Sequence, residues 1–416
     1  MAAEDAVRGI QVEGAWEAGC DPDALRRALA LAAGWVDEGV VPAVGALVAR
    51  GGRVAGEAYL GRRRAGREGP VDAATLWSLA SISKPFTAAA AMLLVDQGRL
   101  SLDEPVCGLV PEFLDAPATA FDRRAVTPRQ LLGHCSGLPG FSEDNLALRR
   151  AHRPIEEFVR SHLRQPLLFE PGTAHVYSNV AIMTAAEMVG RAAAGSLGRR
   201  VEAPAIEHFY SFARERLFGA LGMTSTGFRP PAAWHDRIAW VEETGQEGED
   251  WETDNSAYYR GLGFPWGAVY GTVREVARFA DLFVPGANGA WRLGAPAGAP
   301  RRVLSPAAAR AMRSVQWRPP DAPPDLAPEL REGVPSPPRP EVVWGIGWGV
   351  QGAGRGADFT SPATFFHGGS SGTLIWADPE TDLVCALFTN RAFASGWAAD
   401  RPRPTLFANA VVASLR

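Results

Sequence analysis

The apolar positions near the start of the chain predict one helix followed by two strands. Residues 22–38 carry apolar side chains at helical spacing, and Asp21 stands where an N-cap is expected. A mostly apolar run over 42–60 is divided by the pair Gly51-Gly52. Two such runs joined by glycines are typical of a β-hairpin, so we expect two paired strands in this segment.

The middle of the chain has a mostly helical pattern. A strongly apolar helix is predicted from about Ser81 to Gln97, and Gly98 is expected to end it. Residues 127–230 also favour helices, with breaks at proline and glycine. Residues 231–270 follow neither the helical nor the strand period and are rich in Trp and Tyr, so we expect an irregular excursion there.

The last third of the chain returns from helix to strand. Residues 272–284 have a helical pattern. The pattern then predicts strands at 342–351, 372–377 and 382–390, and a final helix over 402–414. Strands therefore occupy both ends of the chain, and most of the helices lie between them.

This order of elements defines the expected fold class. We predict an α+β fold in which an antiparallel sheet, flanked by helices, is built from both ends of the chain. The sheet domain would be discontinuous and comprise residues 1–80 and 271–416. The mostly helical domain, 81–270, would include the aromatic-rich excursion at 231–270. Residues 318–340 contain nine prolines, which excludes regular helix and central strand, so we expect a surface loop there.

Composition narrows the function by exclusion. The 416 residues carry 42 basic and 46 acidic side chains, a net charge of −4, and the arginines are dispersed, so we expect no nucleic-acid partner. No apolar run approaches the about 18 residues that a membrane span needs, and no signal-peptide pattern is present, so we expect no membrane partner and a cytoplasmic location.

The cysteines and histidines show no metal-site spacing, so we predict neither a metal nor a cofactor. Reduced thiols, as in a cytoplasmic protein, are the expectation for the four scattered cysteines, Cys20, Cys107, Cys135 and Cys385.

Almost every basic residue of the chain is arginine rather than lysine. Of the 42, all are arginine except Lys84. Arginine stays charged in proteins, whereas a buried lysine can lose its proton. A lone lysine is therefore a candidate for proton chemistry, although composition alone leaves open that it survived by drift.

The surroundings of this lysine strengthen the chemical interpretation. Ser81 precedes Lys84 by three positions, and residues i and i+3 share a helix face. Ser81 would lie at a helix N-terminus, where the macrodipole favours developing negative charge. A serine hydroxyl needs a neighbouring base to become a nucleophile, and a desolvated lysine can be that base. The alternative is a helix-capping serine with an exposed lysine.

A second candidate element is Tyr177-Ser178-Asn179, which precedes a helical run. A tyrosine beside a lysine ammonium can have a lowered pKa, so Tyr177 could act as a proton relay. Asn179 both donates and accepts, so it could hold a substrate carbonyl and Lys84. The alternative is a tyrosine that packs in the helical domain with its hydroxyl satisfied locally.

The third candidate element is His367-Gly368-Gly369-Ser370. Apolar residues on both sides indicate a strand, and the two glycines would let a substrate approach the backbone closely. We therefore expect His367, Gly368 and Gly369 to line a substrate site. The backbone N–H groups of Ser81 and Ser370 could form an oxyanion hole.

The same segment also matches a different motif. Residues 368–372 fit G-x-S-x-G, the nucleophile elbow of α/β-hydrolases. That elbow must be followed by a helix and later by a histidine, whereas here strands follow and no histidine comes after His367. We therefore reject the elbow interpretation.

The three elements, in this order, resemble the serine β-lactamase and penicillin-recognising superfamily. The most similar branch is the class C-like one, which includes esterases of the β-lactamase fold, D-aminopeptidases and D,D-peptidases. The resemblance covers roughly residues 20–412. Its further landmarks are the segments LLGHCSGLP at 131–139, FEPG at 169–172, LGM at 221–223 and GIGW at 345–348.

The resemblance implies a role for each candidate residue. Ser81 would be acylated, and Lys84 and Tyr177 would activate it and shuttle protons. His367 would line the edge of the site, with Asn179 as a ligand of the substrate or of Lys84. True β-lactamases usually have a lysine in place of His367, and histidine is cationic only part of the time at pH 7.

This departure from the β-lactamases favours another substrate. We predict a serine hydrolase that forms an acyl-enzyme with a small ester or amide and is most similar to an esterase. The alternatives are an acyltransferase of the same fold in a biosynthetic pathway, a β-lactamase or D-amino-acid peptidase, and a non-catalytic scaffold.

The aromatic-rich excursion leaves two interpretations open. Its aromatic side chains could line an acyl or aryl pocket, or they could anchor a long loop. They are Trp234, Trp240, Trp251, Tyr258, Tyr259, Phe264, Trp266 and Tyr270.

Overall fold

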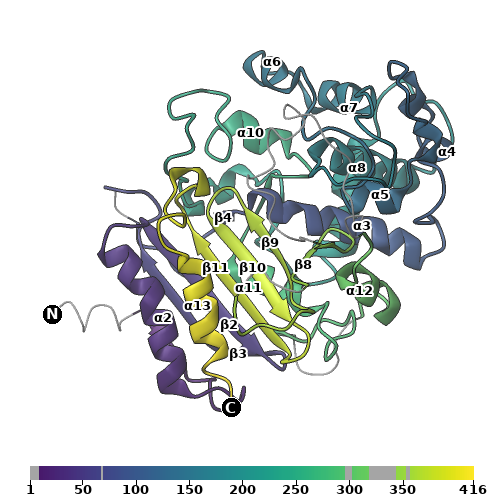
Figure 1. Ribbon diagram of the computed structural model, residues 1–416. Coiled ribbons are helices and arrows are strands. Elements are labelled where there is room, and N and C mark those ends of the chain that lie inside the picture. Colours follow the sequence, from purple (N-terminus) through teal and green to yellow (C-terminus); the bar gives the residue numbers. More distant parts are fainter. Residues whose placement is uncertain (1–8, 67–68, 296–301, 318–342, 353–356) are drawn as a thin grey trace.

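The computed structural model shows a sheet covered by helices on both faces and a helical region beside it (Figure 1). The proline-rich segment predicted as a surface loop, 318–340, lies outside the residues that the structure describes. The residues that the structure describes are 9–66, 69–295, 302–317, 343–352 and 357–416.

The main sheet has eight strands in the order β1-β3-β2-β11-β10-β9-β8-β7, and all neighbours are antiparallel. The two ends of the chain meet where β2 pairs with β11, which confirms the predicted α+β fold with a sheet built from both ends. The strands are β1 (Ile10–Gln11), β2 (Ala43–Arg50), β3 (Arg53–Gly61), β7 (Val343–Trp344), β8 (Gly349–Val350), β9 (Phe365–Gly369), β10 (Thr373–Asp378) and β11 (Leu383–Thr389).

One predicted strand, 342–351, is divided in the structure. Its described part forms a tight hairpin of β7 and β8, closed by a hydrogen bond from Gly345 N to Trp348 O at 2.8 Å. Gly347 adopts φ +76°, a conformation that L side chains rarely adopt, and this turns the chain. The prediction of one continuous strand was wrong because the apolar run contains this glycine turn.

Helices α2 (Pro22–Asp37) and α13 (Arg403–Val412) lie side by side across one face of the sheet (Figure 1). As predicted, Asp21 caps α2, and its side chain accepts from Ala24 N at 2.7 Å. Helix α11 (Val273–Asp281) packs on the opposite face against β2, β10 and β11. The sheet therefore has an apolar core on each side.

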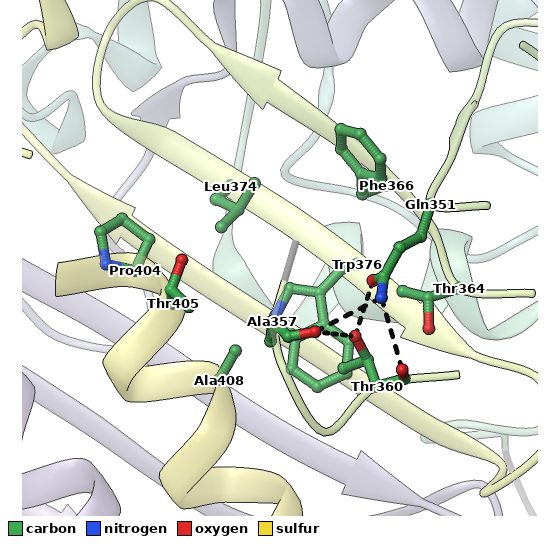
Figure 2. Close-up of a pocket in the computed structure, with 10 residues that line it drawn as sticks. All are labelled: Gln351, Ala357, Thr360, Thr364, Phe366, Leu374, Trp376, Pro404, Thr405 and Ala408. Atoms are coloured by element: carbon green, nitrogen blue, oxygen red, sulfur yellow. Dashed lines mark hydrogen bonds between the residues drawn. The ribbon is translucent and has the colours of Figure 1, made fainter. Parts of the chain in front are cut away.

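The face of the sheet that α13 covers also contains a small cavity of about 130 Å³ (Figure 2). Phe366, Leu374 and Trp376 line it from the sheet, and α13 closes it with Pro404 and other residues. His367 lies next to Phe366 in β9, and successive side chains of a strand point to opposite faces. The candidate site is therefore on the far side of the sheet from this cavity.

The helical region is centred on two almost completely buried helices, α3 (Ser83–Asp96) and α8 (Asn179–Ala194), which pack against each other. Among the described residues, no helix is both long and apolar enough to cross a membrane. The other helices of the described chain are α4 (Val106–Leu109), α5 (Pro128–Leu132), α6 (Asn145–Arg150), α7 (Ile155–Leu163), α9 (Ile206–Ala213), α10 (Ala257–Leu262) and α12 (Pro306–Arg313), with short 3-10 turns between them.

A second, three-stranded sheet joins the two parts of the chain. Its order is β4 (Trp77–Ser78), β6 (Val269–Gly271) and β5 (Gly227–Phe228). The pairing of β4 with β6 brings the two predicted domain borders, after residues 80 and 270, side by side. The chain that leaves the aromatic-rich excursion therefore runs beside the start of the α3 region.

Gly369 ends β9 against the segment that leads into α3. A Cβ at this position would lie 2.3 Å from the backbone oxygen of Leu79 and 2.3 Å from Thr373 Oγ1. At Gly368 the nearest such atom, Thr373 O, is 3.9 Å away. The close approach of β9 to residue 79 therefore depends on glycine at 369.

We expect Gly369→Ala to lower the free energy of unfolding by about 1–3 kcal/mol, because the added methyl group meets backbone that cannot move aside cheaply. Gly368→Ala is the matched control and should stay within about 0.5 kcal/mol of the wild type. Urea unfolding followed by circular dichroism measures both. Equal midpoints for the two variants would contradict the packing argument.

Candidate active site

Ser81 and Lys84 meet as the sequence predicts. Lys84 Nζ lies 3.0 Å from Ser81 Oγ and donates to the backbone oxygen of Trp266, also at 3.0 Å. Ser81 belongs to a 3-10 turn, Ala80–Ile82, that continues directly into α3, so the helix begins slightly later than predicted. The Lys84 side chain is completely buried.

The backbone before Ser81 is strained. Ala80 has φ +43°, a conformation that residues with a Cβ rarely adopt. The neighbouring residue Leu79 is fixed on both sides, because its N–H donates to Val269 O at 2.9 Å and its oxygen accepts from Ile82 N at 3.0 Å. This strain is held in place by tertiary hydrogen bonds at the predicted nucleophile.

A short segment from 265 to 269 holds the first turns of α3. Thr87 Oγ1 donates to Pro265 O at 2.7 Å, and Ser83 Oγ accepts from Val269 N at 2.9 Å. Between them lies the Trp266 oxygen that binds Lys84. Sequence reasoning selected Trp266 for its ring and missed its backbone role, since a carbonyl leaves no signal in the sequence.

The aromatic-rich excursion is anchored rather than open. The Asp254 carboxylate accepts a short hydrogen bond from Ser78 Oγ, and Tyr270 donates from its hydroxyl to Asp254 O at 2.7 Å. Burial of these side chains favours the loop-anchoring interpretation over an aromatic pocket. The buried aromatics of the excursion are Trp251, Tyr259, Phe264, Trp266 and Tyr270.

Burial sets the protonation of Lys84. Loss of solvent lowers the pKa of the Lys84 ammonium well below its usual value. Its two hydrogen-bond partners, the Ser81 hydroxyl and the Trp266 carbonyl, are uncharged. Burial therefore favours the neutral amine, which is the form that can accept a proton from Ser81.

Tyr177 is the third member of this cluster. Its side chain forms a hydrogen bond with that of Ser81, and Lys84 Nζ lies 4.4 Å from its ring centroid. Burial raises the pKa of the Tyr177 phenol, although the hydrogen bond from Ser81 opposes this shift. The expectation of a lowered pKa was wrong, because the complete burial of the phenol penalises its charged form. Tyr177 is therefore suited to donate a proton rather than to start as a phenolate.

His134 positions Tyr177, and sequence reasoning noted it only as part of a landmark. Its buried ring lies 4.6 Å from the Tyr177 ring, measured between centroids. Ser178 N donates to His134 Nδ1 at 3.1 Å, and Val176 N donates to His134 O at 3.0 Å. The residues on both sides of Tyr177 are thus bound to one histidine.

Asn179 begins α8 and is buried, but it does not bind Lys84 in this structure. The hydrogen bonds of Lys84 go to Ser81 and Trp266. The Asn179 Oδ1 atom is buried and has no hydrogen-bond partner among the described residues. Of its two predicted roles, contact with a substrate therefore remains the prediction.

His367 lies beside Tyr177, with ring centroids 6.2 Å apart. Burial, and then the nearby Lys84, lower the pKa of His367 to about 3. The partial positive charge expected from the sequence is therefore absent near neutral pH. A substrate carboxylate would meet a neutral imidazole here.

The end of β9 is tied to the nucleophile segment. Ser371 Oγ donates to Ser78 O at 2.6 Å, and β9 packs against the 3-10 turn of Ser81. The N–H of Ser370 makes no hydrogen bond among the described residues. The fold thus brings the predicted glycine-rich element to the predicted nucleophile.

Trp344 completes one wall of the site and was not singled out from the sequence. Its ring centroid lies 5.6 Å from that of Tyr177 and 5.9 Å from that of His367. It also contacts His134 edge-on and stacks on His175.

Among the described residues, no group of three or more His, Cys, Asp or Glu side chains is arranged to hold a metal ion.

Comparisons with known proteins agree with this architecture. The family profile described as Beta-lactamase matches residues 28–408. Penicillin-binding protein 4 of Amycolatopsis lactamdurans is 28% identical over 331 residues, which cover 78% of this chain and 75% of that protein. Esterase EstB of Burkholderia gladioli is 34% identical over 171 residues, which cover 38% of this chain and 43% of that protein.

An uncharacterised protein of Mycobacterium tuberculosis is 34% identical over 187 residues. The match covers 41% of this chain and 43% of that protein, so the chain spans less than half of the length of this relative.

Solved structures match along almost the whole chain. A penicillin-binding protein homologue from Caulobacter crescentus has a TM-score of 0.72 at 22% identity, covering 98% of this chain and 100% of that one. A family VIII carboxylesterase also has a TM-score of 0.72, at 20% identity and the same coverage.

A third structure, EstCE1, described as a hydrolase with promiscuous acyltransferase activity, has a TM-score of 0.69 at 21% identity and covers 94% of this chain and 99% of that one. The chain belongs to the β-lactamase family.

The protonation state of Lys84 can be measured directly, because it is the single lysine of the chain. Selective ¹³C,¹⁵N-lysine labelling should give one side-chain signal by NMR. We expect its titration midpoint in the folded protein to lie well below the about 10.4 of a free lysine, since burial penalises the ammonium. The free amine would be present above this midpoint and lost as the pH falls through it.

The same sample unfolded in urea is the control and should titrate near about 10.4. A folded-state midpoint at that value would show that Lys84 rests as an ammonium, which would exclude it as the base.

Proposed function

We propose that this protein is a serine hydrolase that cleaves a small ester, or less readily an amide, through an acyl-enzyme on Ser81. One observation carries the proposal: the completely buried Lys84, whose pKa burial lowers, places Nζ 3.0 Å from Ser81 Oγ. This distance suits proton transfer, and the lowered pKa of Lys84 favours the unprotonated amine that must accept the proton. Similarity to an esterase and to a penicillin-binding protein supports the same class of chemistry.

In the first half-reaction, Ser81 Oγ attacks the substrate carbonyl carbon while its proton passes to Lys84 Nζ. The bond from that carbon to the leaving oxygen then breaks, and Tyr177 donates its phenolic proton to the leaving oxygen. The Lys84 ammonium returns a proton to Tyr177, so both groups regain their resting states. The raised pKa of Tyr177 supports its assignment as the acid.

Negative charge on the former carbonyl oxygen needs preorganised donors. We assign this role to the backbone N–H groups of Ser81 and Ser370. The packing of β9 against the turn that contains Ser81 supports the assignment. In the second half-reaction, water attacks the acyl carbon, its proton passes to the same Lys84–Tyr177 pair, and Ser81 recovers its hydrogen as the acid leaves.

The neutral His367 favours esters over β-lactams. A β-lactam carries a carboxylate, and a buried carboxylate needs a cationic partner to offset its desolvation. His367 stays uncharged near neutral pH because burial lowers its pKa to about 3. This supports the esterase assignment.

Acyl transfer is the second candidate. It uses the same acyl-enzyme and differs in that an alcohol or amine, rather than water, accepts the acyl group. The wall of Trp344, Tyr177 and His134 beside Ser81 favours it, since apolar surroundings disfavour water.

As part of the proposal we place the protein in the cytoplasm, which its four unpaired cysteines support.

A fluorophosphonate probe should label wild-type protein at Ser81 and fail on Ser81→Ala. Ser101→Ala, which removes an exposed serine, is the matched control and should label fully. We expect Ser81→Ala and Lys84→Arg each to lower kcat/KM on p-nitrophenyl butyrate by at least about 1000-fold. The first removes the attacking hydroxyl, and the second replaces the amine by a guanidinium that cannot accept the proton. Mass spectrometry and a chromogenic assay give the readouts.

Two results would contradict the proposal. Near-normal turnover by Lys84→Arg would remove the proton-transfer role of Lys84. Turnover of a chromogenic cephalosporin faster than of p-nitrophenyl butyrate would make the protein a β-lactamase. Added alcohol that yields a new ester faster than free acid would favour acyl transfer.

A further inference from the structure

One nitrogen of His367 has no partner, and its hydrogen-bonding character is fixed. His367 Nδ1 lies 2.9 Å from the backbone oxygen of Gly368. A carbonyl oxygen only accepts, so Nδ1 carries the hydrogen of the neutral ring. Nε2 is therefore a bare lone pair, and it is buried without a hydrogen-bond partner among the described residues.

The ring that carries this lone pair lies beside Tyr177, the proposed proton donor to the leaving group. Tyr177 forms a hydrogen bond with Ser81 and is the proton donor to the leaving oxygen in the proposed reaction. The His367 ring lies beside that of Tyr177, with centroids 6.2 Å apart, and Trp344 packs against both. A leaving group that reaches the Tyr177 hydroxyl therefore comes close to His367.

No charged group of the described site offsets this acceptor. Lys84 and His134 are the titratable side chains coupled to His367, and burial lowers the pKa of both, which favours their uncharged forms. The other neighbouring rings, those of Tyr177 and Trp344, carry no charge. A buried acceptor without a donor costs free energy, which a substrate donor would recover.

We infer that the substrate is an ester whose alcohol part bears a second hydroxyl or an N–H group, which donates to His367 Nε2. This inference rests on the proposed function and narrows its substrate class. A carboxylate in the same position would place two acceptors against each other with no cation. His367 thereby selects the leaving group without taking part in bond breaking.

Three esters of butyric acid test this selection, because they differ only at the end of a short alcohol part. They are 2-hydroxyethyl butyrate, 2-methoxyethyl butyrate and carboxymethyl butyrate. For the wild type we expect kcat/KM on the hydroxyethyl ester to exceed that on the methoxyethyl ester about tenfold, the effect of one buried hydrogen bond. The wild-type kcat/KM on the hydroxyethyl ester should exceed that on the carboxymethyl ester by a larger factor than tenfold.

Substitution of His367 should change the ratios. His367→Lys replaces the acceptor by an amine that a bound carboxylate would hold as an ammonium, so the preference for hydroxyethyl over carboxymethyl ester should fall at least about 100-fold and reverse. His367→Gln keeps an acceptor oxygen and should retain part of the hydroxyethyl preference. His208→Lys makes the same chemical change at an exposed histidine of α9 and should keep the wild-type ratios.

Each ratio is taken on a variant whose unfolding midpoint and fluorophosphonate labelling match the wild type, so a misfolded variant is recognised. Equal wild-type rates on the hydroxyethyl and methoxyethyl esters, with p-nitrophenyl butyrate still hydrolysed, would overturn this inference and leave the proposed function standing. Ratios unchanged in both His367 variants would also overturn it. Wild-type protein that neither labels at Ser81 nor hydrolyses any ester would overturn the proposed function, and this inference with it.

Discussion

The complete burial of one amine, Lys84, is the constraint on which the rest of the site depends. A charged ammonium is costly in this position, because its hydrogen-bond partners are a hydroxyl and a carbonyl, so burial lowers the pKa of Lys84 and favours the neutral amine. In the proposed reaction this lowered pKa suits Lys84 to be the base. It also explains why the phenol of Tyr177 keeps its proton, since no cation is present to stabilise a phenolate. The two proton carriers thereby receive opposite tasks from one cause, the exclusion of water.

The burial of Lys84 is achieved by chain segments that are far apart in sequence. The segment 265–269 supplies the Trp266 oxygen and binds the first turns of α3 through Thr87 and Ser83. From the other side, β9 comes close because Gly369 has no side chain to meet Leu79. The aromatic-rich excursion, anchored through Asp254 to Ser78, keeps the first of these segments in place. Its buried aromatics therefore act on the site through the backbone that they hold.

The expectation for His367 shows where sequence reasoning was limited. The residue was correctly noted as a departure from the lysine usual in true β-lactamases, but its charge was expected to be partly positive. The structure buries the ring and fixes its tautomer through the Gly368 oxygen, so it presents a neutral acceptor. His134 and Trp344 were missed as site residues for a related reason. Their contribution is contact with Tyr177, and sequence spacing carries no information on contacts between distant segments.

The sequence by itself determined the α+β fold built from both chain ends, the helices at 22–38 and 272–284, and the pairing of Ser81 with Lys84, because these depend on local periodicity and on the i, i+3 geometry of a helix. Tertiary structure alone decided the protonation states, the hairpin inside 342–351, and the approach of Tyr177 and His367 to Ser81. Solvent exclusion and contacts between distant segments set these properties, and neither is encoded in the spacing of residues along the chain.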